Sequence, residues 1–134
     1  MMGNLEIPVY LFTGFLGSGK TTFIQELLDG DDFNAGERTL LLLCEEGEVA
    51  LEPEHFASPN VFIERIMKED LTPDKLADLE EKHRAERVMI EYNGMWMLDD
   101  LFTSMPDSWM IYQEMMFADA STFMMYNTNM RQLT

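Results

Sequence analysis

Near its beginning the chain reads Gly14-Phe15-Leu16-Gly17-Ser18-Gly19-Lys20-Thr21-Thr22. This run matches the phosphate-binding pattern G-x-x-x-x-G-K-S/T. The preceding residues, 7–13, are rich in β-branched and aromatic types, which predicts a short buried strand. In the following residues, 22–28, the apolar side chains recur at helical spacing. A strand, a glycine-rich turn and a helix in this order are the context that the pattern requires, so the run predicts a P-loop.

Each residue type in this run suits the binding of phosphate. Gly14, Gly17 and Gly19 allow backbone N–H groups to converge on an anion, and the start of a helix adds partial positive charge at the same point. Lys20 is expected to reach the outer phosphates of a nucleotide, and the Thr21 hydroxyl to bind Mg²⁺. The other interpretation, a turn that only links a strand to a helix, is disfavoured once the flanking segments are counted.

Length and charge narrow the class of protein. At 134 residues the chain is expected to form a single domain, residues 1–134. It carries 9 basic and 25 acidic residues, a formal net charge of −16, which argues against nucleic-acid partners and against anionic membrane surfaces. The distant carboxylates are screened beyond about 8 Å, whereas loop amides and Lys20 act on a phosphate at contact. With one cysteine, no charged-then-apolar leader and no long apolar run, we expect a cytoplasmic protein.

The rest of the chain alternates between apolar runs and helical patterns. Helices are predicted from Thr72-Pro73, over 95–102 and, capped by Ser121, over 122–133, and strands are predicted at 39–44, 61–66, 87–91 and within 109–120. Such alternation predicts a mainly parallel sheet in a three-layer αβα sandwich, with the P-loop at the carboxyl edge of the sheet. Glu45, Glu91 and Asp119 each follow an apolar run and are expected at that edge.

Four stretches, taken together, resemble one known family. Residues 8–22 look like the opening of CobW-like P-loop GTPases, relatives of the nickel-insertion GTPases that serve urease and hydrogenase. Residues 44–52 are similar to the family's N-E-x-G-E-V-G-x-D segment, and residues 88–94 to its hydrophobic strand followed by E-x-x-G. Residues 117–120 are similar to its V-D-A strand end. The likeness extends over nearly the whole chain, and its order gives weight to the weaker segments.

The resemblance implies an Mg²⁺-dependent protein that binds GTP, or else ATP, and hydrolyses it slowly while handing a metal ion or metallocofactor to a client metalloprotein. It implies Lys20, Glu45 and Glu91 as catalytic residues, Glu45 ordering the attacking water or making a second metal contact. Thr21 and Glu91 would hold Mg²⁺. Nucleotide phosphates would be held by Gly14, Gly17, Ser18, Gly19, Lys20, Thr21, Thr22 and Gly94.

Two family features are missing. The C-x-C-C metal cluster is absent, and the single cysteine, Cys44, stands where the family has Asn. His55 with its acidic neighbours is the remaining candidate for a weak metal site, although a surface histidine is the simpler interpretation. The guanine-reading N/T-K-x-D motif is also absent, because the K-x-D at 68–70 precedes Glu91 in the chain. Two interpretations follow: a fragment, truncated after its fourth or fifth strand, or a reduced member of the family with no guanine reader. A truncated sheet edge would favour homo-oligomers or marginal stability.

Two other functions stay open. One is a non-catalytic, nucleotide-gated interaction module that uses the methionine-rich stretches 95–97 and 115–130 as contact area. The other is a small P-loop kinase, which would need a basic lid that nine basic residues supply poorly. For an arginine finger the nearest candidates are Arg38 and Arg131, and both are better explained as surface charges.

Overall fold

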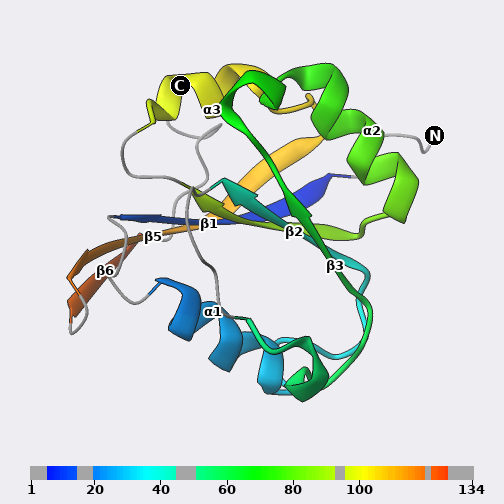
Figure 1. Cartoon of the computed structure of the whole chain (residues 1–134), viewed down its shortest axis with the longest axis vertical. Helices are drawn as coiled ribbons and strands as arrows, with labels where there is room; N and C mark the ends of the chain where they lie inside the picture. Colours follow the sequence, from blue (N-terminus) through cyan, green and yellow to red (C-terminus); the bar gives the residue numbers. More distant parts are fainter. Residues whose placement is uncertain (1–5, 15–19, 45–50, 93–95, 120–121, 127–134) are drawn as a thin grey trace.

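The computed structural model describes residues 6–14, 20–44, 51–92, 96–119 and 122–126 (Figure 1). These residues form one sheet of six strands in the order β3-β2-β4-β1-β5-β6. Its strands are β1 (Ile7–Gly14), β2 (Thr39–Cys44), β3 (Val61–Arg65), β4 (Arg87–Tyr92), β5 (Trp109–Asp119) and β6 (Thr122–Tyr126). The helices are α1 (Lys20–Asp29), α2 (Pro73–His83) and α3 (Leu98–Ser104), with short 3₁₀ turns η1 (Pro53–His55) and η2 (Lys68–Asp70).

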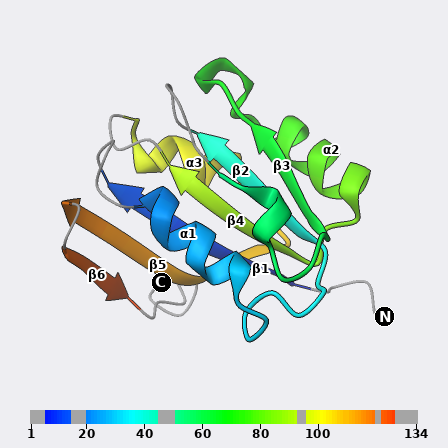
Figure 2. The ribbon, with the colours of Figure 1, turned by 60° about the horizontal axis from the view of Figure 1, so that its bottom comes forward.

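The sheet is mainly parallel, as predicted. β1, β2, β3, β4 and β5 run in one direction and β6 pairs with β5 in the opposite direction (Figure 2). α1 covers one face of the sheet, and α2 and α3 cover the other (Figure 1). The predicted α/β sandwich of three layers is therefore confirmed. The carboxyl ends of β1 and its parallel neighbours meet along one edge, the edge at which such sheets bind ligands.

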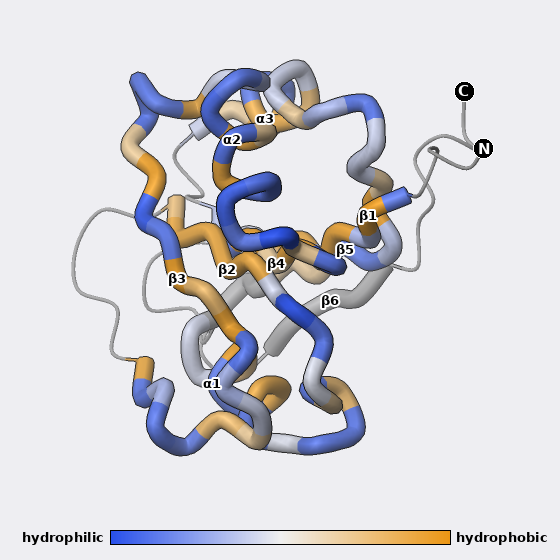
Figure 3. The backbone as a smooth tube through the Cα atoms, turned by 90° about the vertical axis from the view of Figure 1, so that its right-hand side faces the viewer, coloured by the Kyte–Doolittle hydropathy of each residue, from blue (hydrophilic) through white to orange (hydrophobic). Residues whose placement is uncertain are grey.

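Side-chain alternation along the strands builds a hydrophobic core on each face. β2 is buried at every position, because its two faces lie under different helices. Figure 3 shows the apolar strands in the middle of the molecule and hydrophilic residues along much of α2. The core under α2 and α3 contains Val9, Leu11, Leu40, Leu42, Cys44, Val88, Ile90, Tyr92 and Ile111 from the sheet, with Leu76, Leu79 and Leu101 from the helices. The core under α1 contains Phe12, Leu41, Leu43, Met89 and Met115, with Ile24 and Leu28 from α1.

The predicted start of α2 is confirmed in detail. The Thr72 hydroxyl accepts a hydrogen bond from the backbone N–H of Lys75, and Pro73 occupies the first turn. The helix ends at Arg84, which has φ 50° and ψ 50°. α3 begins at Leu98, later than the sequence pattern indicated, and ends at Ser104, shortly before Pro106. In the described part of the chain no helix is long and apolar enough to cross a membrane.

The predicted helix over 122–133 is wrong where it can be compared. Residues 122–126 form β6, with Met116 paired to Met124 and Glu114 to Tyr126 on β5. The segment Thr-Phe-Met-Met-Tyr contains β-branched and aromatic residues, and an adjacent strand supplies a hydrogen-bonding partner that helix propensity cannot anticipate. The expected cap Ser121 and residues 127–134 lie outside the described part.

Candidate functional site

The candidate site lies at the carboxyl edge of the sheet, where β1 ends and α1 begins. β1 ends at Gly14, whose φ of 139° lies in the left-handed range that favours glycine. α1 begins at Lys20, so its N-terminus faces the same edge (Figure 2). Outside the described part of the chain lie Gly17, Ser18, Gly19, Glu45 and Gly94, and the side chain of Lys20 is not described.

Thr21 and Glu91 are brought into direct contact. The Thr21 hydroxyl donates a hydrogen bond of 2.6 Å to Oε2 of Glu91. Thr21 belongs to the first turn of α1, and Glu91 lies on β4, which pairs directly with β1. Alternation along β4 places Glu91 on the same face as Met89, the face that α1 covers. Two residues that the sequence predicted as Mg²⁺ ligands therefore meet across the interface between helix and sheet.

The Glu91 carboxylate is almost fully buried. The side chain is 1% exposed, and its register neighbours, Phe12 on β1 and Leu43 on β2, belong to the apolar core under α1. A buried carboxylate is costly unless hydrogen bonds or a cation stabilise it. Carboxylate and hydroxyl oxygens are the hard ligands that Mg²⁺ prefers. The Thr21–Glu91 pair thus has the chemistry of a magnesium site.

Gln25 fastens the next segment of the chain to α1. One turn after Thr21, the Gln25 carboxamide accepts from the backbone N–H of Glu52 at 2.8 Å and donates to the Glu52 carbonyl at 3.1 Å. It also donates to Asp29 at 2.7 Å. The backbone N–H of Ala57 donates to the carbonyl of Leu28, the last buried residue of α1. Residues 51–57 are therefore attached along α1.

Three exposed side chains on this attached segment lie close together. Ligand atoms of Glu52, Glu54 and His55 all lie within 4.8 Å of one another. His55 Nδ1 lies 3.3 Å from Oε1 of Glu52. All three residues are exposed, and exposed acidic groups are common without an ion, so the geometry of the cluster alone assigns it no ion.

Tyr92, the residue after Glu91, fastens β4 to the opposite helical layer. Its hydroxyl donates to the Met97 carbonyl at 2.6 Å, and the Trp96 ring lies edge-on to its ring at a centroid distance of 5.8 Å. Burial, and then the nearby Cys44 and Asp100, raise the pKa of Tyr92 above its usual value. Sequence reasoning attached no role to this residue, which lies within residues 88–94, one of the segments that carry the family resemblance.

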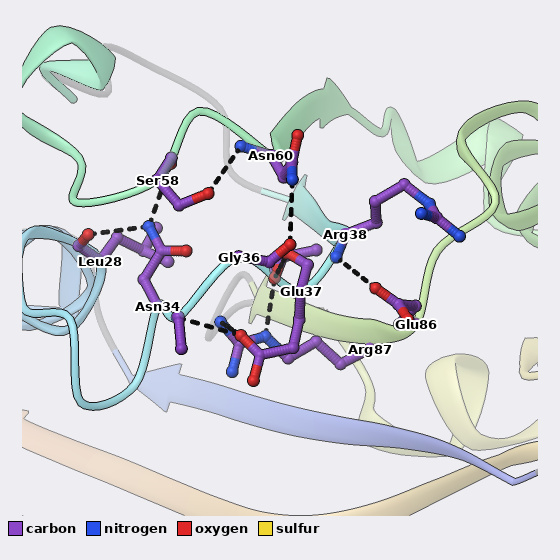
Figure 4. A network of polar contacts seen from close by, with 11 residues as sticks. Leu28, Asn34, Gly36, Glu37, Arg38, Ser58, Asn60, Glu86 and Arg87 are labelled. Atoms are coloured by element: carbon purple, nitrogen blue, oxygen red, sulfur yellow. Dashed lines mark hydrogen bonds and ion pairs between the residues drawn. The ribbon is translucent and has the colours of Figure 1, made fainter.

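A separate polar network lies at the opposite edge of the sheet, where the parallel strands begin (Figure 4). The Arg87 guanidinium donates to the Thr39 hydroxyl at 2.6 Å, lies 3.6 Å from Glu37 and stacks 4.0 Å from the Phe33 ring centroid. Burial lowers the pKa of Arg87 from its usual value, and Glu37 opposes this change. Arg38 lies at the same edge, where its guanidinium donates to the Arg84 carbonyl. The Arg38 side chain therefore lies away from the Thr21–Glu91 pair.

The sequence of the chain is similar to those of known proteins. The sequence profile of the CobW/HypB/UreG nucleotide-binding domain matches residues 8–126. A zinc chaperone CobW from a Sinorhizobium species is 30% identical over 104 residues, which are 67% of this chain and 28% of that protein. A zinc chaperone CobW from Pseudomonas aeruginosa is 39% identical over 49 residues, 37% of this chain and 12% of that protein. The chain therefore spans less than a third of the length of either curated relative. No solved structure matches the chain significantly.

Proposed function

The chain belongs to the CobW/HypB/UreG family of nucleotide-binding domains, and from this premise we propose that it binds a nucleoside triphosphate with Mg²⁺ and hydrolyses it slowly. The resemblance to CobW-like GTPases implies GTP as the nucleotide, and ATP is the alternative. The proposed setting is the cytoplasm. A client metalloprotein would receive a metal ion or metallocofactor from the chain. An exposed sheet edge would favour association of two copies of the chain.

The observation that supports this proposal most is the contact between Thr21 and Glu91. In a P-loop the hydroxyl after the lysine binds Mg²⁺, and a carboxylate on a neighbouring strand binds the same ion directly or through water. Here the two oxygens lie 2.6 Å apart, close enough to serve one ion. When bound, Mg²⁺ would neutralise the charge that develops on the phosphate oxygens.

The other residues of the proposed site act by position and charge. Backbone N–H groups of the loop, with Gly14, Gly17 and Gly19 keeping it free of side chains, would hold the phosphates. Lys20 would bind the outer phosphates, assisted by Ser18 and Thr22, with Gly94 close to the terminal phosphate. Glu45 would orient the attacking water. Because phosphoryl transfer depends mainly on positioning and charge stabilisation, these groups suffice for slow turnover.

Metal delivery is the finer part of the proposal. The two curated relatives are named zinc chaperones, and we extend this link to a metal ion or metallocofactor for the present chain. Zinc prefers thiolate and imidazole ligands, whereas the single cysteine, Cys44, is buried on β2. The proposed metal transfer would therefore need ligands other than a cysteine cluster of this chain.

A nucleotide-gated interaction module is the second candidate. Among the described residues of the two methionine-rich stretches, Met97 is 62% exposed and Met116 is 40% exposed, whereas Met115 is buried. Methionine suits adaptable contact surfaces. Such a module would bind the nucleotide through the same loop but would release no phosphate.

One set of titrations separates these functions. GTP, ATP and GDP are titrated with Mg²⁺ against the chain and its Lys20→Ala variant, and phosphate release is then followed. The proposal expects Mg²⁺-dependent binding, release of phosphate, and at least about tenfold weaker binding by Lys20→Ala. Binding without release supports the interaction module, and transfer of phosphate to a small acceptor supports the kinase. Unchanged affinity in Lys20→Ala refutes the nucleotide site.

A further inference from the structure

The last two residues of β4 are fastened to helices on opposite faces of the sheet. Glu91 accepts a hydrogen bond from the hydroxyl of Thr21 on α1, and the Tyr92 hydroxyl donates a hydrogen bond to the carbonyl of Met97, just before α3. The Met97 carbonyl also accepts the backbone N–H of Asp100, the first-turn hydrogen bond of α3. Tyr92 is therefore joined to the beginning of α3 through the carbonyl of Met97, the residue that precedes the helix as its N-cap.

The two neighbouring strands do not pair with the end of β4 over the same length. Among the described residues, the pairing of β4 with β1 ends at Phe12 and Glu91, whereas its pairing with β2 continues to Cys44 and Tyr92. The end of β4 is thus held on one side by β2, and the Tyr92 side chain supplies a further attachment. Because Glu91 immediately precedes Tyr92, a rotation of the strand end would move the Glu91 carboxylate relative to Thr21.

We propose that Tyr92 is a positioning residue of the magnesium site, whose hydroxyl bond to Met97 holds the end of β4 so that Glu91 meets Thr21. This inference rests on the proposed function, since it concerns the Mg²⁺ ligands of that site. Phenylalanine could pack against Trp96 as well as the tyrosine ring does. The positioning role is therefore assigned to the Tyr92 hydroxyl and not to its ring. The hydroxyl donates to a single acceptor, the Met97 carbonyl, at 2.6 Å.

The test compares Tyr92→Phe, which removes only the hydroxyl, with the unmodified 134-residue chain. The affinity for Mg²⁺ is measured at saturating GTP, and the affinity for GTP is measured separately in EDTA. Trp96 fluorescence reports the local environment, with Trp109→Phe as the background that leaves Trp96 as the only tryptophan. Replacing Tyr92 with 4-aminophenylalanine retains a donor on the same ring and serves as the rescue.

Two variants control for unrelated effects. Tyr112→Phe makes the same chemical change at an exposed tyrosine on β5. Ile66→Val removes one buried methylene from the core cluster that contains Tyr92 but leaves the hydroxyl bond intact. A purely structural role of Tyr92 would lower thermal stability in the same way as Ile66→Val and would leave the affinity for Mg²⁺ unchanged.

We expect Tyr92→Phe to weaken Mg²⁺ binding about 3- to 10-fold, with GTP affinity in EDTA changed less than about twofold. The 4-aminophenylalanine variant should recover most of the loss, and both controls should bind Mg²⁺ like the unmodified chain. Equal Mg²⁺ affinity in Tyr92→Phe, the same loss in Ile66→Val, or a failure of Tyr92→Phe to fold overturns the positioning role. If the unmodified chain binds no nucleotide, the proposed function fails, and the inference fails with it.

Discussion

Thr21 on α1 and Glu91 on β4 are 70 residues apart in sequence and share a hydrogen bond of 2.6 Å. Their contact depends on the strand order, because β4 inserts between β2 and β1 after the chain has formed β3. Insertion of β4 next to β1 brings a buried carboxylate to the first turn of the helix that follows the P-loop. The candidate site is therefore a product of the sheet topology as well as of the glycine-rich loop.

Arg87→Lys should destabilise the fold without affecting the nucleotide site. The Arg87 guanidinium makes a hydrogen bond to Thr39 and an ion pair with Glu37 at the same time, and it stacks on Phe33. A lysine ammonium has no planar group to stack on Phe33 and cannot make the two polar contacts together. We expect a loss of about 1–3 kcal/mol in the free energy of unfolding, measured by urea denaturation. Nucleotide affinity should not change, because this network lies at the opposite edge of the sheet, where the parallel strands begin. Arg38→Lys, at an exposed position, is the matched control, and an equal loss there would contradict the expectation.

Glu64→Gln should remove a pH-dependent part of the stability. The His83 side chain, and then Lys82, hold the pKa of Glu64 below its usual value. A lowered pKa in the folded state means that this stabilisation is present above the unfolded pKa of about 4.3 and disappears as the pH falls through the folded pKa. Glu64 lies 2.7 Å from His83 and is partly buried on β3, so we expect a difference of about 0.5–1 kcal/mol.

The measurement is the free energy of unfolding of both proteins at pH 5.5 and pH 3. The difference between them should be present at pH 5.5 and smaller at pH 3. Glu81→Gln, an exposed carboxylate on α2, controls for the change in net charge. A difference that grows as the pH falls would contradict the assigned direction of the pKa change.

Gln25→Leu should loosen the attachment of residues 51–57 to α1. Leucine preserves the approximate size of the side chain but removes both hydrogen bonds to the Glu52 backbone. The Glu52 amide should exchange with solvent about tenfold faster, while the amides of β2 keep their protection. Glu26→Gln changes an adjacent exposed residue and should leave the exchange unaffected. Unchanged protection of Glu52 would show that other contacts fix this segment.

The sequence predicted correctly those elements that depend on residues close together in the chain. The Thr72-Pro73 start of α2 depends on a cap and a fixed φ within a few residues, and it is present as predicted. The apolar run at 39–44 depends only on burial of both faces, and it forms β2 as predicted. The segment at 122–126 depends on β5 as a pairing partner, a nonlocal contact, and its predicted helix was wrong.

The same distinction applies to the site. The P-loop pattern pointed to Thr21 because the motif itself contains that residue, and Glu91 was visible as an acid at the end of an apolar run. Gln25 and Tyr92 were not singled out. Each forms a hydrogen bond with the backbone of a residue outside its own helix or strand, Gln25 with Glu52 and Tyr92 with Met97. Hydrogen bonds from side chains to a remote backbone leave no spacing pattern that sequence reasoning could detect.

A double-mutant cycle on Mg²⁺ binding tests most directly the proposal that Thr21 and Glu91 bind one ion. Thr21→Val and Glu91→Gln, alone and combined, are compared with the unmodified chain by titrating Mg²⁺ at saturating GTP, with GTP affinity in EDTA as the reference. If both oxygens bind one ion, each substitution should weaken Mg²⁺ binding by at least about tenfold. The double variant should bind Mg²⁺ only slightly more weakly than the single variant with the lower Mg²⁺ affinity. Unchanged Mg²⁺ affinity, or losses that simply multiply in the double variant, would contradict a common magnesium site.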